Sequence, residues 1–221
     1  DQITIEDLGT AITDQTINTT GSGKSITIQS NTSGGIQFLD ANDKIQTNGG
    51  AIGLHAFGTG SLTNIGSLVS NGGAIQLISQ GGGLSVGSGL TLDAGAGDLF
   101  LYANGVLSLA NATTVKGANV LLSTWNNAAF NINSTAVADG TNIVTTPQDL
   151  AKISLTVPAT GVLTIRGGSS GNNIAFNAPV AFDPAKVATL KLLQLNGGQI
   201  TQNVSAPLSV QKLAVDGGEG G

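Results

Sequence analysis

The heptamer Asn48-Gly49-Gly50-Ala51-Ile52-Gly53-Leu54 returns 23 residues later as Asn71-Gly72-Gly73-Ala74-Ile75-Gln76-Leu77. A looser copy covers residues 94–101, a fourth begins at residue 117, and degenerate relatives lie at residues 23–28 and 196–201. A self-similar period of about 20–24 residues is the signature of a chain built from stacked structural repeats. This repeat decides the fold class.

Within each copy the hydrophobic residues alternate with a period of two. Ile75 and Leu77 flank Gln76, as Ile26 and Ile28 flank Thr27, which is the pattern of short strands with one buried face. Gly and Asn between the strands permit the positive φ of a sharp turn. Each copy therefore predicts one coil of a β-solenoid, with equivalent aliphatic residues stacked at the ~4.8 Å strand spacing. About nine coils would form a rod roughly 40 Å long.

A leucine-rich repeat is the alternative at this period. It requires leucines in the order L-x-x-L-x-L, and a helix or 3₁₀ segment often forms the other half of each repeat. Here the leucines pair only at i and i+2, as Leu90 and Leu92 do, and no window keeps a helical apolar pattern over four turns. The all-β solenoid is therefore favoured.

Composition narrows the possible partners. The 221 residues include 33 Gly and no Cys or Met, and eight Lys+Arg against thirteen Asp+Glu give a net charge of -5. An acidic chain is a poor partner for nucleic acid or anionic membranes, and no apolar run approaches the ~18 residues of a membrane span. The lack of Cys excludes a disulfide scaffold and thiol catalysis, and the lack of Met predicts a processed or excised product.

Two segments interrupt the repeat inside one predicted domain, a β-solenoid over residues 1–216 that ends in a Gly-rich tail or linker at 217–221. Residues 123–152 lengthen one coil and hold the only Trp, and residues 178–189 contain two prolines that an interior ladder position cannot accept. An insertion in a solenoid is either a loop on a binding face or a flap over an exposed strand edge. Both interpretations remain open.

Catalytic residues are not expected. Glycoside hydrolysis needs two converging carboxylates, yet the residue one period after Asp93 is Lys116, and no column of acids appears. The single His55 aligns with Ile78 of the next copy, and no G-x-S-x-G elbow accompanies it. We therefore assign no catalytic and no cofactor-binding residue and predict that the chain is not an enzyme.

Metal ligands are not assigned either. The acidic turns at residues 40–43 and 93–98 gather oxygen atoms of the kind that Ca²⁺ prefers, but ordinary Asp and Asn turn chemistry explains both. One candidate partner-binding patch remains, at Trp125, Asn126, Asn127 and Phe130 in the insertion. The alternative for these residues is a small hydrophobic cluster that pins the insertion to the shaft.

The Gly-Gly-x-Ile-x-Leu strand starts, the abundant Asn and Thr, the lack of Cys and the stretch at residues 197–210 resemble the filamentous-haemagglutinin-like exoproteins and autotransporter passengers of Gram-negative bacteria. The resemblance implies a right-handed parallel β-helix that is exported across the outer membrane. The secretion domain of that family carries Asn-Pro-Asn motifs, whereas this chain has no Asn-Pro pair. The chain therefore resembles the repeat shaft of such proteins.

The resemblance implies an extracellular or outer-surface protein that serves adhesion, biofilm cohesion or cell contact. We accordingly expect a structural or adhesive shaft whose partners are other protein chains, the rest of a longer exoprotein, or surface glycans, with no nucleic acid and no membrane insertion. The alternatives are a subunit that polymerises head to tail into a filament, and a polysaccharide-active β-helix enzyme.

Overall fold

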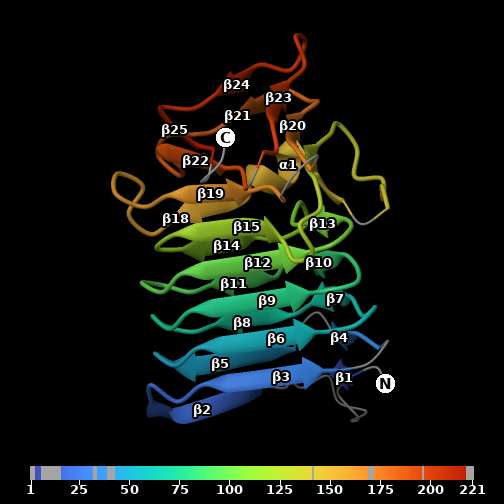
Figure 1. The fold of residues 1–221 in the computed structure, drawn as a ribbon. Helices are drawn as coiled ribbons and strands as arrows, with labels where there is room; N and C mark the ends of the chain where they lie inside the picture. The colour runs from blue at the N-terminus through green and yellow to red at the C-terminus, as the bar shows by residue number, and fades with distance from the viewer. Residues whose placement is uncertain are drawn as a thin grey trace.

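The chain winds into a stack of coils whose strands lie above one another from the N-terminal end to the C-terminal end (Figure 1). The computed structural model describes residues 3–5, 16–31, 34–38, 43–140, 142–168, 172–195 and 197–217. Every pairing between its named strands is parallel. The fold is thus the predicted all-β solenoid.

Each regular coil contributes one strand to each of three sheets, so the solenoid is three-sided in its regular part. The eight-stranded sheet holds β3 (Ile26–Ser30), β6 (Ile52–Ala56), β9 (Ile75–Ser79), β12 (Leu99–Ala103), β15 (Val120–Thr124), β19 (Leu163–Arg166), β22 (Thr189–Leu193) and β25 (Lys212–Asp216). The six-stranded sheet holds β2 (Thr16–Ser22), β5 (Lys44–Asn48), β8 (Ser67–Val69), β11 (Thr91–Asp93), β14 (Thr114–Gly117) and β18 (Ile153–Leu155). The five-stranded sheet holds β1 (Ile3–Ile5), β4 (Ile36–Phe38), β7 (Leu62–Ile65), β10 (Leu84–Val86) and β13 (Leu107–Ser108).

The upper part of the stack has two further sheets and the helix. A four-stranded sheet holds β17 (Ile143–Thr145), β16 (Phe130–Ile132), β20 (Ile174–Phe176) and β23 (Ile200–Gln202), in that spatial order. A two-stranded sheet pairs β21 (Val180–Ala181) with β24 (Leu208–Ser209). The helix α1 (Pro147–Leu150) is a single turn.

The core is a column of aliphatic residues stacked rung upon rung. In the eight-stranded sheet the register pairs Ile52 with Ile75, Ile75 with Leu99, and Leu99 with Val120, steps of 23, 24 and 21 residues. These side chains are at most 1% exposed, and burying each contributes about 1.5–3 kcal/mol. The predicted coil length and ladder are confirmed. Eight strands give about eight turns rather than nine, because the step from Val120 to Leu163 takes 43 residues.

The second glycine of the repeated Asn-Gly-Gly triplet is required by the stacking distance. A Cβ on Gly73 would lie 2.2 Å from the backbone oxygen of Gly50 in the preceding coil. Gly97, which takes the same place in the looser copy without the triplet, is equally close, since its Cβ would lie 2.2 Å from the oxygen of Gly73. Gly72, the residue before Gly73, forms the turn itself. Its φ is 114°, a value at which only glycine is unstrained. The triplet therefore encodes a turn followed by a close approach between coils.

The insertion adds a strand to the solenoid instead of only lengthening a loop. β17 follows β16 in the chain, yet it lies on the N-terminal side of β16 and is joined to the coil below by a bridge between Val106 and Val144. On this side of the stack the chain must therefore climb one additional rung between β15 and β16, over residues 125–129. Ser123 and Thr124 still belong to β15, so the extra chain begins at Trp125.

A buried carboxylate holds the insertion in place. Asp149, 1% exposed, accepts hydrogen bonds through Oδ1 from the backbone N–H groups of Leu109 (2.5 Å) and Ala110 (2.7 Å). Its Oδ2 accepts from the N–H of Thr146 at 2.9 Å and from its hydroxyl at 2.6 Å, which closes a capping box on α1. One side chain thus joins the helix to the end of β13.

The C-terminal copies differ from the sequence prediction. Residues 196–201 were expected to repeat the heptamer, but Ile200 pairs with Ile174 in the four-stranded sheet, so this assignment was wrong. The strands that continue the heptamer ladder are β22 and β25, which the comparison of copies missed. The proline-containing segment at 178–189 forms β21 and a turn before β22. Of the predicted tail, residues 218–221 lie outside the described residues.

Candidate functional site

The outer face of the eight-stranded sheet gathers aromatic and cationic side chains that lie far apart in the sequence. The register stacks two outward columns on this face. The first column holds Gln76, Phe100, Leu121, Thr164 and Lys191. The second column holds His55, Ile78, Tyr102, Ser123 and Arg166. The neighbouring five- and six-stranded sheets have no comparable concentration of rings among their described residues.

An aromatic cluster, formed by His55, Phe57, Tyr102 and Trp125, lies along one edge of this face. The ring of Trp125 is 6.0 Å from that of Phe57 and 5.7 Å from that of Tyr102, and His55 meets Phe57 edge-on at 5.8 Å. Aromatic pairs of this kind stabilise by about 0.5–1.5 kcal/mol each. Ile78 lies in the same outward column as His55 and Tyr102, yet it is only 4% exposed. The cluster therefore ties the start of the insertion to coils below it.

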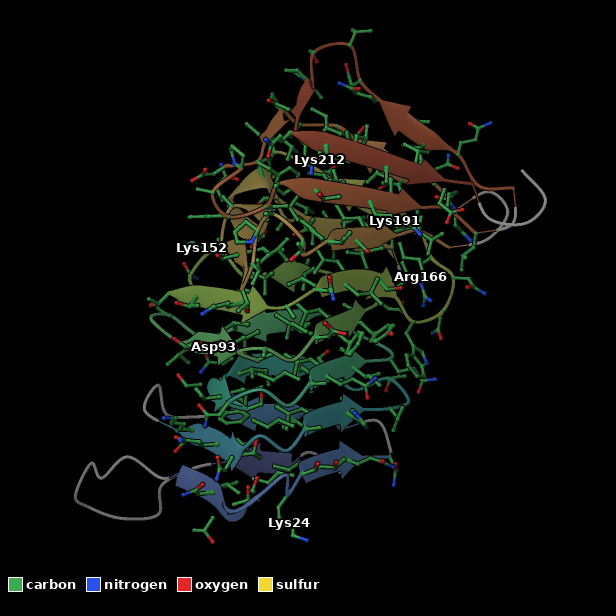
Figure 2. The ribbon with its side chains drawn as sticks, turned by 90° about the vertical axis from the view of Figure 1, so that its left-hand side faces the viewer. Lys24, Asp93, Lys152, Arg166, Lys191 and Lys212 are labelled. Atoms are coloured by element: carbon green, nitrogen blue, oxygen red, sulfur yellow. The ribbon has the colours of Figure 1, made fainter. Side chains whose placement is uncertain are left out.

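A fixed guanidinium group extends the cluster upward. Arg166 places its Cζ 5.8 Å from the centroid of the Tyr102 ring, and its Nε donates a 2.7 Å hydrogen bond to the hydroxyl of Ser123. Lys191, one rung above, pairs with Asp216 at 3.0 Å, and Figure 2 shows Arg166 and Lys191 close to one another on the same side of the shaft. Among the described residues Arg166 forms no ion pair.

Beside the first column the surface is hollowed. A shallow groove of about 290 Å³ is lined by Phe100, Leu121, Thr164, Arg166, Lys191 and Leu193, together with Asn119 and Val120. A second hollow of about 200 Å³ continues from Phe100 toward the N-terminal end and reaches Gln76 and His55. A third, of about 310 Å³, shares Asn119 and lies against residues 156–161. Phe100 thus stands between two hollows of one outer face.

Of the four residues of the predicted patch, Trp125, Asn126 and Asn127 are exposed and Phe130 is buried. Trp125 is 37% exposed and belongs to the aromatic cluster. Asn126 donates to the backbone oxygen of Gln80 at 3.3 Å, and Asn127 adopts a φ of 55° at the step between rungs, so both shape the corner. Phe130 is 0% exposed and stacks in the core, so it does not belong to a surface patch.

Sequence reasoning missed Phe57, Phe100, Tyr102 and Arg166 as members of this face. For two of them the sequence contained a usable pattern. Phe100 and Tyr102 alternate within one strand, and the repeat places that strand one coil above Gln76 and Ile78. Arg166 had no such pattern, since the 43-residue coil separates it from Ser123, its partner one rung below. The contact of Phe57 with Trp125 depends on side chains reaching across rungs.

His55 is a packed residue in this arrangement. It aligns with Ile78, as the repeat predicted. Burial lowers the pKa of His55 from its ordinary value of 6.5, and a hydrogen bond with the Gln76 side chain offsets part of that change. Its Nε2 is buried without a hydrogen-bond partner. The neutral imidazole is therefore the form that the fold favours.

The acidic turn at residues 93–98 uses its carboxylates for turn hydrogen bonds. Asp93 accepts from the N–H of Gly95 at 2.7 Å, and Asp98 accepts from the backbone and side chain of Asn119 at 3.1 and 2.9 Å. Residues 40–42 of the other acidic turn lie outside the described residues. In the part of the chain that the structure describes, no cluster of three or more His, Cys, Asp or Glu side chains is arranged to hold a metal ion.

None of the described helices has the length and apolar character needed to cross a membrane. Comparison with protein-family models, with curated proteins and with solved structures finds no match to this chain. The resemblance to filamentous-haemagglutinin-like exoproteins therefore stays a prediction.

Proposed function

We propose that this chain is a stiff, non-enzymatic shaft on the outside of a Gram-negative cell, where it mediates attachment between cells or to surfaces. The observation that carries the proposal is the parallel ladder of eight strands along the axis, which continues across the 43-residue coil without a break (Figure 1). Bending such a stack would strain inter-coil hydrogen bonds on every rung, so the shaft resists deformation.

The chemistry of the surface suits an exposed setting. The chain has no Cys to oxidise, and the backbone groups that proteases must extract are held in strand ladders. Thr, Ser, Asn and Gln occupy many of the outward positions, as Thr27 and Gln76 do. These features support a role outside the cell.

A second candidate is a filament subunit that stacks head to tail. At the C-terminal end, Leu213 and Val215 of β25 continue the inner ladders of Leu190 and Leu192 but are 51% and 61% exposed. β25 is the terminal strand of its sheet among the described residues, and an exposed apolar edge strand favours pairing with a further strand. Electron microscopy of the purified chain distinguishes filaments from single rods of roughly 40 Å, and Leu213→Lys should leave only single rods.

Antibody labelling of the producing cells tests the proposed location, and inhibition of attachment by added soluble chain tests the role. We expect intact cells to be labelled and attachment to fall with increasing folded chain, with heat-unfolded chain as the control. Labelling that appears only after permeabilisation would refute the proposed location. Equal inhibition by the unfolded control would refute the attachment role.

A further inference from the structure

We propose that the groove beside Phe100 binds an acidic polysaccharide, a linear glycan with uronate carboxylates. Arg166 would bind the carboxylate, and Phe100 and Leu121 would form the floor under the sugar ring. The inference names a ligand for the attachment role, and in that respect it rests on the proposed function.

The guanidinium of Arg166 is held in one orientation and has N–H groups available to bind a carboxylate. The Ser123 hydroxyl and the Tyr102 ring fix its orientation, and Nε is the only one of its nitrogens in a hydrogen bond with a described residue. The remaining N–H groups form the planar fork that matches a carboxylate with two hydrogen bonds. Because the side chain is already held, less conformational entropy is lost on binding.

The charge around the groove also favours an acidic ligand at this place. The chain as a whole carries a net charge of -5, so an anionic polymer is repelled from most of it. Of the two cations that line the groove, Lys191 is paired with Asp216, and the Asp98 carboxylate accepts a hydrogen bond from Asn119 at the groove wall. Among the described residues that line the groove, Arg166 is therefore the cation without an ion pair.

The floor of the groove matches the apolar face of a sugar ring. Phe100 and Leu121 occupy adjacent rungs, about 4.8 Å apart, and both are partly buried with one side open. A pyranose presents C–H groups on its faces and hydroxyls at its rim, and Thr164 offers a hydroxyl at the groove wall. The volume of about 290 Å³ lies at the low end of ligand pockets, which suits a short stretch of a polymer.

An extended acidic peptide fits the same surface less well. The backbone N–H and C=O groups of the eight-stranded sheet pair along the ladder, so the face offers only side chains to a ligand. A peptide laid on it would gain no backbone hydrogen bonds from the sheet, which are the usual source of affinity when an extended peptide binds a sheet. Sugar hydroxyls can keep their hydrogen bonds to water while the ring packs on Phe100.

Calorimetric titration of the full chain tests the proposal with oligogalacturonate, with neutral maltohexaose and with poly-glutamate. The variants are Arg166→Gln, which removes the charge, and Phe100→Ala, which removes the floor. Lys152→Gln is the matched control, because Lys152 lies on the other side of the shaft (Figure 2). A thermal unfolding curve for each variant confirms that it is folded.

We expect the wild-type chain to bind oligogalacturonate in preference to the other two probes. Arg166→Gln and Phe100→Ala should each weaken that binding at least about tenfold, and Lys152→Gln should leave it unchanged. No binding of oligogalacturonate, equal binding of maltohexaose or poly-glutamate, or an equal loss in Lys152→Gln would overturn the proposal. The shaft role would survive these results, because cell labelling and inhibition of attachment measure it separately.

Discussion

Replacing Gly73 with alanine tests the central feature of the fold, which is the close stacking of one coil on the next. The added Cβ would lie 2.2 Å from the oxygen and 2.3 Å from the carbon of Gly50, and 2.8 Å from the nitrogen of Ala51, all backbone atoms. Restoring ordinary contact requires the coils to separate by about 1 Å. A shift of that size would break the 2.9 Å hydrogen bond from the Ile52 N–H to the Ala74 oxygen.

The cost combines overpacking, about 1–3 kcal/mol, with about 1 kcal/mol for each backbone hydrogen bond that is lost. The smaller conformational entropy of unfolded alanine offsets about 0.4–1 kcal/mol. We therefore expect Gly73→Ala to lower the free energy of unfolding by about 1–4 kcal/mol, which is roughly 2–15 °C in Tm for a chain of this size.

Thermal unfolding followed by circular dichroism measures the change. Gly217→Ala is the matched control, because Gly217 has no atom within 4 Å of the added Cβ and no positive φ, and its Tm should stay close to that of the wild type. If Gly73→Ala unfolds at the same temperature as Gly217→Ala, the coils are not in the contact described, and the stacking argument is refuted.

Three other changes separate the contributions to stability. Asp149→Ala leaves buried N–H groups and a Thr hydroxyl without an acceptor and should cost about 2–5 kcal/mol, measured by urea unfolding; a loss below that of a surface substitution contradicts the proposed anchor. Because burial lowers the pKa of His55, the unfolded chain binds the proton more readily, so stability should fall as the pH drops below about 6.5. His55→Gln should reduce the difference in urea midpoint between about pH 7.5 and about pH 5.5, and an unchanged difference would assign it to other groups. Lys191→Ala removes a half-exposed ion pair with Asp216 and should change the free energy of unfolding by no more than about 1 kcal/mol; a larger loss would mean that this pair closes the upper coil.

Much of the shaft could be predicted because a parallel stack copies its chemistry from rung to rung. The 23-residue shift between Ile52 and Ile75 is the spatial register of β6 and β9, so comparing the sequence with itself located the ladder. The same comparison failed at residues 196–201, where a Gly-Gly-containing segment of similar composition lies on another side of the solenoid. Glycine and aliphatic residues mark a strand start, and they do not specify which side of the stack that strand joins.

The helix and its anchor illustrate another limit. The segment Thr146-Pro147-Gln148-Asp149 carries the residues of a helix start, yet one turn is too short to produce a helical apolar pattern. The chain gave no sign that Asp149 would accept hydrogen bonds from residues about 40 positions earlier. That contact exists because β17 enters the sheet below β16, an event that depends on packing between distant segments.

By itself the sequence determined the solenoid, its coil length, its inner column and the position of the insertion, because these features follow from local alternation and a repeated glycine turn. Only the tertiary structure decided that Phe130 is buried, that the insertion adds a rung, and that Arg166 lies over Tyr102 beside the groove. Periodic backbone pairing can be recognised from neighbouring copies. Contacts between side chains of different coils depend on the length and orientation of each side chain, and the repeat does not encode either.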